Sequence, residues 1–240
     1  LFVSNPTNVS FEDYASDYGD FWQIYTENVI NLTSDSFSES LINFQQEKDF
    51  AKPYKEIIDQ YQDFSPQLKN LSRAFYYYNE AFPDKVIPEI ITFFGGFNYV
   101  AIATDSVLGI GLEMFLGNNS YYSKLVHKFP KYMHQQFNSK YLSSVVLNGW
   151  LESEFPVTLD DFLTQMIHFG KIKYTLNKLL VDAPPDIVMG YTQEQIKWCQ
   201  NSEFQIWKFL IEEGYEKLNL FVNSCLVICR PFNTEIKEGS

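Results

Sequence analysis

The sequence predicts an α+β fold that is mainly helical and carries one small antiparallel β-meander around residues 90–116. Most of the chain places apolar residues at helical spacing, whereas residues 108–116 place them at every second position, which is the period of a strand. Gly109 and Gly111 would each cost about 1 kcal/mol in a helix interior. In a strand, glycine is typical where another part of the chain approaches closely.

The first 88 residues are expected to form a helical cap over the sheet. Ser36 and Glu39 match a capping box, in which each side chain bonds the other residue's backbone. Ser65 followed by Pro66 matches an N-cap with proline at the first helical position. The expected helices are Tyr18–Asn31, Ser36–Gln46, Lys52–Asp63 and Ser65–Ala81.

Residues 89–117 contain the expected meander. Its strands are predicted at Ile90–Phe94, Tyr99–Ala103 and Leu108–Leu116, with turns at 95–98 and near Asp105. Each strand would pair with the next one along the chain, so all pairs would be antiparallel.

Residues 118–240 are predicted to be helical again. Thr158 with Asp161 resembles a capping box and opens a helix over Leu159–Leu180, whose apolar residues recur at three and four. Thr192 with Gln195 opens another helix, which runs toward Glu213 and breaks near residues 201–202. No flexible linker interrupts the chain, so residues 1–240 are expected to form a single domain.

Composition excludes several classes of protein. The net charge of −12 argues against nucleic acid as a partner, because a nucleic-acid binder needs basic residues to neutralise phosphates. Three cysteines do not form the even framework of a small disulfide-stapled protein, and buried thiols are the favoured interpretation. No stretch reaches the roughly 18 consecutive apolar residues of a membrane-spanning helix.

Histidine is too scarce for the common hydrolytic zinc site, in which an HExxH helix supplies two imidazoles one turn apart. His127 and His134 are separated by Pro130, which breaks the helix that would align them. His168 is expected on the polar side of its helix, satisfied by solvent or by one hydrogen bond. We therefore expect no metal and no other cofactor.

Carboxylates and aromatic residues supply the remaining candidates. Asp105 and Glu113 lie near the expected meander and could form a catalytic pair, although Asp105 also suits a turn. Trp198 and Trp207 lie nine residues apart and could pack in a core or form a binding platform.

Five segments, in one order between about Pro88 and Trp207, carry a family resemblance. They read FFGGFNY, TDSVLGIGLEMFLG, FPKYM, QMIHFGKIKYTLNKLL and GYTQEQIKWCQNSEFQIWKF. Together they resemble the GldB family of gliding-motility lipoproteins of Bacteroidetes. The resemblance implies a protein exported from the cytoplasm and tethered in the cell envelope by a lipidated N-terminal cysteine that would precede Leu1. Its partners would be other motility or secretion proteins of the envelope.

The family is also distantly similar to zinc peptidase-like lipoproteins, which implies a zincin-like scaffold. The helix that would carry HExxH reads QMIHFGK here, so the resemblance implies the scaffold without the enzyme. A groove between the edge strand of the meander and the helix at Leu159–Leu180 could then hold a partner by strand addition. The candidate groove residues are Asp105, Glu113, His168, Trp198, Glu203 and Trp207.

Two alternatives to this contact role stay open. One is an extracytoplasmic hydrolase with an atypical site built from Asp105, Glu113, His168 or Glu203. The other is an aromatic-lined ligand-binding protein with a pocket near Trp198 and Trp207.

Overall fold

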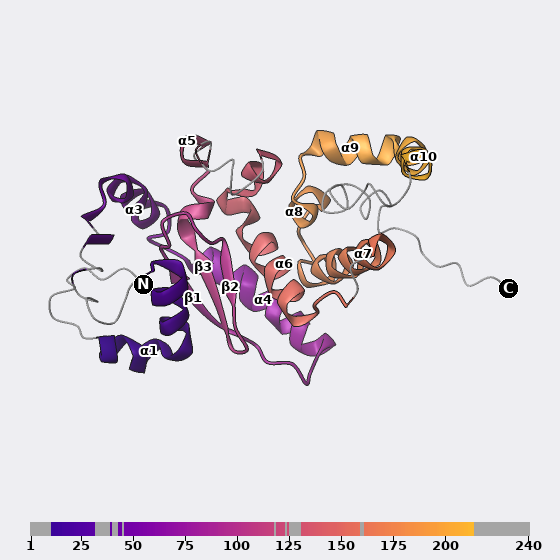
Figure 1. The fold of residues 1–240 in the computed structure, drawn as a ribbon. Helices are drawn as coiled ribbons and strands as arrows, with labels where there is room; N and C mark the ends of the chain where they lie inside the picture. The colour runs from indigo at the N-terminus through magenta and orange to yellow at the C-terminus, as the bar shows by residue number, and fades with distance from the viewer. Residues whose placement is uncertain are drawn as a thin grey trace. The chain divides into compact units, whose positions relative to one another are not determined.

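Helix-forming segments with clear start signals dominate the computed structural model of the chain (Figure 1). The structure describes residues 11–31, 39, 43–44, 46–117, 119–122, 124, 131–158 and 161–213. Most of the helix expected at 36–46 lies outside these residues, as do His127, Cys225 and Cys229. Contacts divide the chain into two compact units, Leu1–Leu142 and Ser143–Ser240, and each is described by itself. The expectation of one domain stays a prediction.

The first unit combines helices with one small sheet. Its helical elements within the described residues are α1 (Phe11–Ile24), the π-helix η2 (Tyr25–Val29), α3 (Lys48–Gln60), α4 (Ser65–Ala81), the 3-10 helix η4 (Leu112–Phe115), α5 (Asn119–Tyr122), η6 (Lys131–Gln136) and η7 (Ser139–Tyr141). Helix α4 has the predicted bounds. The predicted cap is wrong, because Phe64 rather than Ser65 is the N-cap and no side chain makes a capping hydrogen bond. The Asp63 carboxylate accepts the N–H of Ser65 at 2.9 Å.

The sheet is mixed, and the prediction of an antiparallel meander is wrong. Its strands are β1 (Glu89–Phe93), β2 (Ala101–Ala103) and β3 (Val107–Gly111), in the order β1-β3-β2. Strand β3 pairs in parallel with β1 and antiparallel with β2, so β1 and β2 are not neighbours. The last strand is also shorter than predicted, because residues 112–115 turn into η4.

The glycines of β3 let other parts of the chain approach the sheet closely. Gly109 pairs with Ile91, and a Cβ at Gly109 would lie 2.5 Å from the Phe21 ring. A Cβ at Gly111 would collide with the backbone carbonyl of Tyr99. The interpretation of these glycines as sites of close approach therefore fits the observed packing.

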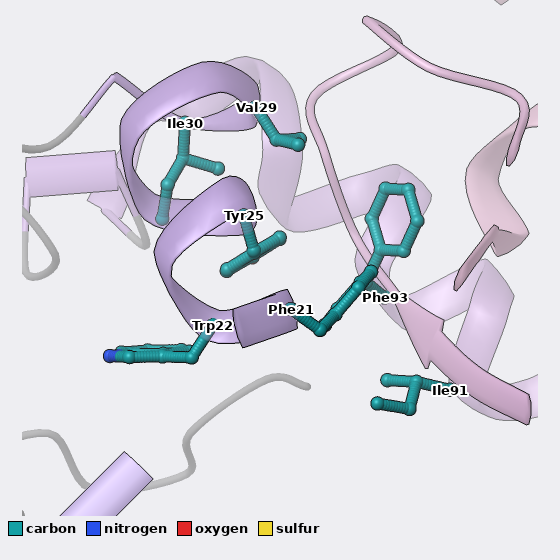
Figure 2. Close-up of a cluster of buried hydrophobic side chains, with 7 residues drawn as sticks. All are labelled: Phe21, Trp22, Tyr25, Val29, Ile30, Ile91 and Phe93. Atoms are coloured by element: carbon teal, nitrogen blue, oxygen red, sulfur yellow. The ribbon is translucent and has the colours of Figure 1, made fainter. Parts of the chain in front are cut away.

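An aromatic cluster joins the first helix to the sheet. Figure 2 shows Phe21, Tyr25 and Val29 directed from α1 and η2 toward Phe93 of β1. The Tyr25 and Phe93 rings meet edge to face with centroids 5.8 Å apart, which is a favourable arrangement of aromatic quadrupoles. This cluster fixes the helical segment against β1, next to the loop that leaves the strand.

The second unit contains helices and no strand among its described residues. Its elements are α6 (Leu142–Glu154), which begins at the last residue of the first unit, α7 (Phe162–Leu179), α8 (Pro185–Met189), α9 (Gln193–Asn201) and α10 (Glu203–Glu213). The predicted break near residues 201–202 is confirmed, as is the capping box of Thr192 and Gln195. Helix α7 starts later than predicted, because Asp161 rather than Thr158 is its N-cap.

Candidate functional site

Glu113 is a fully buried carboxylate at the centre of the first unit. It follows β3 on η4, and one oxygen, Oε1, accepts the backbone N–H groups of Gly95 at 2.7 Å and Phe97 at 3.2 Å. The other oxygen, Oε2, has no hydrogen-bond partner. Two N–H groups two residues apart that converge on one oxygen form a small anion-binding concavity, and here the protein's own side chain fills it.

The loop held by Glu113 has an unusual backbone. Gly96 and Phe97 both have φ of +64°, and a bulky residue such as Phe97 rarely adopts this left-handed conformation. The Phe97 ring is buried and packs 5.4 Å from the Tyr121 ring. A Cβ at Gly95 would lie 2.7 Å from Val29, so the loop requires its first glycine for space. Packing and the Glu113 carboxylate together hold this conformation.

Two tyrosines complete the surroundings of Glu113. The Tyr25 hydroxyl donates to the carbonyl of Phe94 at 2.8 Å, and the Tyr122 hydroxyl donates to the backbone carbonyl of Glu113 at 3.1 Å. Burial raises the pKa of both tyrosines, and the nearby Glu113 charge raises it further. Burial raises the pKa of Glu113 itself to about 7, against the opposing effect of its backbone hydrogen bonds.

Asp105 and Glu113 do not form the predicted pair. Asp105 is exposed in the turn before β3, where the Thr104 hydroxyl accepts the N–H of Val107 at 3.0 Å. Glu113 lies beyond the other end of the same strand. Five strand residues span about 16 Å, which exceeds the separation that paired catalytic carboxylates use. Glu113 is therefore placed to organise the loop after β1.

The other four candidate residues lie in the second unit. His168 is half-buried on α7, with its ring 5.6 Å from that of Phe169. Glu203 is half-buried at the start of α10. Trp198 and Trp207 are 54% and 39% exposed, so they do not line a deep pocket. Within the described residues, no three His, Cys, Asp or Glu side chains are grouped so that they could hold a metal ion.

Helices α7 and α10 contact each other through apolar side chains. Phe162, Met166 and Phe169 of α7 pack with Ile206 of α10. Leu163 and Ile167, two of the apolar residues that recur at helical spacing along α7, are exposed. On α10, exposed Phe204, Trp207 and Ile211 follow one another at three and four residues.

A lysine with a shifted pKa lies on the flank of α7. Burial lowers the pKa of Lys173 to about 8, and the nearby charge of Glu152 opposes this effect. Glu152 is half-buried, and it accepts a hydrogen bond from the Asn148 side chain at 2.7 Å. Cys199 is buried, as predicted.

The five segments that carry the family resemblance include the loop around Glu113 and helices α7, α9 and α10. The chain matches the family described as gliding motility protein GldB over residues 1–220. It belongs to the GldB family. No curated protein and no solved structure matches the chain.

Membership in the GldB family identifies the chain as a gliding-motility lipoprotein component, and it associates the chain with the cell envelope. Among the described helices of this GldB-family chain, none has both the length and the apolar character needed to cross a bilayer. Sequence reasoning included Glu113 among the candidate groove residues, but it missed that Gly95 and Phe97 donate to its carboxylate and that Tyr25 and Tyr122 lie nearby. The signal for Glu113 was its position as the only charged residue between Val107 and Gly117.

Proposed function

We propose that this GldB-family chain acts without catalysis, by binding other proteins of the motility machinery or of its associated secretion apparatus. The observation that carries the proposal is the exposed face of α10. Phe204, Trp207 and Ile211 lie at i, i+3 and i+7, which is the spacing by which an amphipathic helix enters an apolar groove on a partner. Aromatic residues such as Phe204 and Trp207 are also typical anchors of protein interfaces.

The role of Glu113 supports the same proposal. Its carboxylate is enclosed and bonded to the loop of the first unit, so it stabilises structure instead of facing a substrate. The hydrolase alternative would need a second acid near it, and Asp105 lies at the far end of β3. The proposed groove for strand addition would join segments of the two units, and it stays a prediction.

The proposal also includes a lipid anchor and a zincin-like scaffold. A lipid-modified cysteine preceding Leu1 would tether the chain to a membrane of the envelope, with the folded part outside the cytoplasm.

A zincin-like scaffold is proposed as well, because α7 follows the sheet and reads Gln165–Lys171 where HExxH would lie. Superposition of an experimental structure on a zincin peptidase would test this relation, and a different order of strands and helices would reject it.

Motility of cells that carry α10 variants tests the contact role. Phe204→Ser with Ile211→Ser removes two exposed apolar anchors, so we expect gliding and in-cell crosslinking to a motility protein to be lost while the thermal midpoint is unchanged. The matched control is Ile58→Ser with Val86→Ser, two exposed residues of the first unit that should retain gliding. Normal gliding of the α10 variant would reject the proposal, as would a hydrolytic activity on which gliding depends.

A further inference from the structure

Helix α7 presents a line of apolar and basic side chains on its outer side. Leu163, Ile167, Lys171, Tyr174 and Lys178 follow one another at four, four, three and four residues. At 3.6 residues per turn they occupy about a quarter of the helix circumference. Leu163, Ile167 and Tyr174 are 58%, 48% and 51% exposed, and both lysines are exposed. We call these five residues the outer stripe.

The outer stripe lies opposite the buried side of the same helix. The buried residues of α7 are Phe162, Ile172, Leu176 and Leu179. A flank adjoining them packs through Met166 and Phe169 against Ile206 of α10. Large apolar side chains that lie together in water mark a contact surface.

The charge of the outer stripe indicates what it contacts. Helix α7 contains no Asp or Glu, although the chain has a net charge of −12. Its third lysine, Lys173, lies on a flank near Glu152, so the outer stripe carries the two exposed lysines and no carboxylate. The Lys178 ammonium lies 5.3 Å from the centroid of the Tyr174 ring. A face with one sign of charge complements a surface of the opposite sign.

We infer that the outer stripe of α7 binds an anionic lipid bilayer. Leu163 and Ile167 would enter the boundary between head groups and acyl chains, as the apolar face of an interfacial helix does. Lys171 and Lys178 would extend their apolar stems along that boundary and place their ammonium groups among the phosphates. A face that carries only positive charge complements the negative surface potential of an anionic bilayer.

This contact is weak and assists another attachment. Each lysine near an anionic surface strengthens binding about fivefold, so two lysines supply about thirtyfold. Such affinity orients a domain that a lipid modification already holds near a membrane, because membrane anchoring commonly combines two signals. Bilayer binding by the outer stripe does not depend on Phe204 and Ile211 of α10. An experiment can therefore reject the bilayer contact without rejecting the protein contact, and the reverse also holds.

Flotation of the whole 240-residue chain with vesicles tests the inference. One vesicle contains phosphatidylcholine and phosphatidylglycerol in equal parts, and the other contains phosphatidylcholine alone. We expect the chain to bind the first vesicle more tightly and to lose this preference at high salt. Lys171→Gln with Lys178→Gln should lose roughly thirtyfold in affinity for the anionic vesicle. Leu163→Ser with Ile167→Ser should weaken binding to both vesicles.

The matched control is again Ile58→Ser with Val86→Ser, which should bind both vesicles like the unchanged chain. Unchanged anionic binding of the lysine variant would overturn the inference. Failure of the unchanged chain to bind the anionic vesicle would also overturn it, and crosslinking from position 163 to a protein in cells would then assign the outer stripe to a protein partner. If a variant misfolds, the salt dependence of vesicle binding by the unchanged chain still tests the inference.

Discussion

At the scale of single residues, Glu113 links the sheet to the loop after β1. A buried carboxylate whose second oxygen lacks a partner is costly when ionised, and for this reason its pKa rises to about 7. Its backbone N–H partners, Gly95 and Phe97, would in turn be left without an acceptor if the side chain were removed. Glu113 therefore stabilises one loop conformation, but ionisation of its buried carboxyl group lowers the free energy of unfolding at neutral pH.

The raised pKa of Glu113 predicts a specific dependence of stability on pH. Between the ordinary glutamate pKa and about 7, the folded chain holds a proton on Glu113 that the unfolded chain has released. This contribution to stability is therefore present at acidic pH and is lost as the pH rises through that window. Its size is on the order of a few kcal/mol. Urea unfolding across the window should reveal it.

Glu113→Gln should remove this pH-dependent contribution, because the amide still offers an oxygen to Gly95 and Phe97 but does not titrate. We expect the variant to lose less stability than the unchanged chain when the pH rises from five to eight. Glu80→Gln, an exposed residue of α4, is the control and should follow the unchanged chain. An identical pH profile for all three proteins would show that Glu113 does not titrate in this range.

At the scale of secondary-structure elements, local signals predicted helices well and strand pairing poorly. The bounds of α4 and the capping box of α9 follow from interactions between residues at most four apart. The order of the strands depends instead on hydrogen bonds between residues far apart in the sequence, namely those of the Glu113 side chain with the loop after β1. The N–H groups of Gly95 and Phe97 are taken by Glu113, so they cannot form the hairpin that would pair β1 with β2. Nothing local in the sequence marks this long-range bond.

The end of β3 was predicted wrongly for a related reason. Apolar residues at every second position predict a strand with one buried and one exposed side. In residues 112–115 all four side chains are buried. The exposed side that the alternation predicts is therefore absent from this segment. The pairing partner β1 ends where Phe93 meets Gly111, and the chain turns into η4 at that point.

The capping box of α9 makes a prediction at the same scale. The Thr192 hydroxyl accepts the N–H of Gln195 at 3.2 Å, and the Gln195 side chain accepts the N–H of Thr192 at 2.8 Å. Thr192→Ala should cost about 1 kcal/mol and speed hydrogen exchange in the first turn of α9. Thr175→Ala, within α7, is the control for loss of a hydroxyl. Equal exchange in the first turn of α9 for both variants would contradict the role of the box.

At the scale of the whole molecule, the sequence predicts which helix faces are apolar but not which of them the chain covers. The spacing of Leu163 and Ile167 is the same as that of residues inside the core, and only the fold shows that they are exposed. The same holds for Phe204 and Ile211 on α10. The two surfaces that we propose as contact sites, on α7 and α10, are thus departures from the burial that helical spacing predicts.

The boundary between the two units yields the last prediction. It falls between Leu142 and Ser143, at the first residues of α6, and η7 leads directly into that helix. Independent domains are ordinarily joined by an exposed linker of polar residues, proline or glycine, whereas Leu142 is fully buried. We therefore expect the chain to unfold in one cooperative transition. Calorimetry, with exchange protection of Phe93 in one unit and Leu176 in the other, would measure this, and separate transitions for the two amides would establish independent domains.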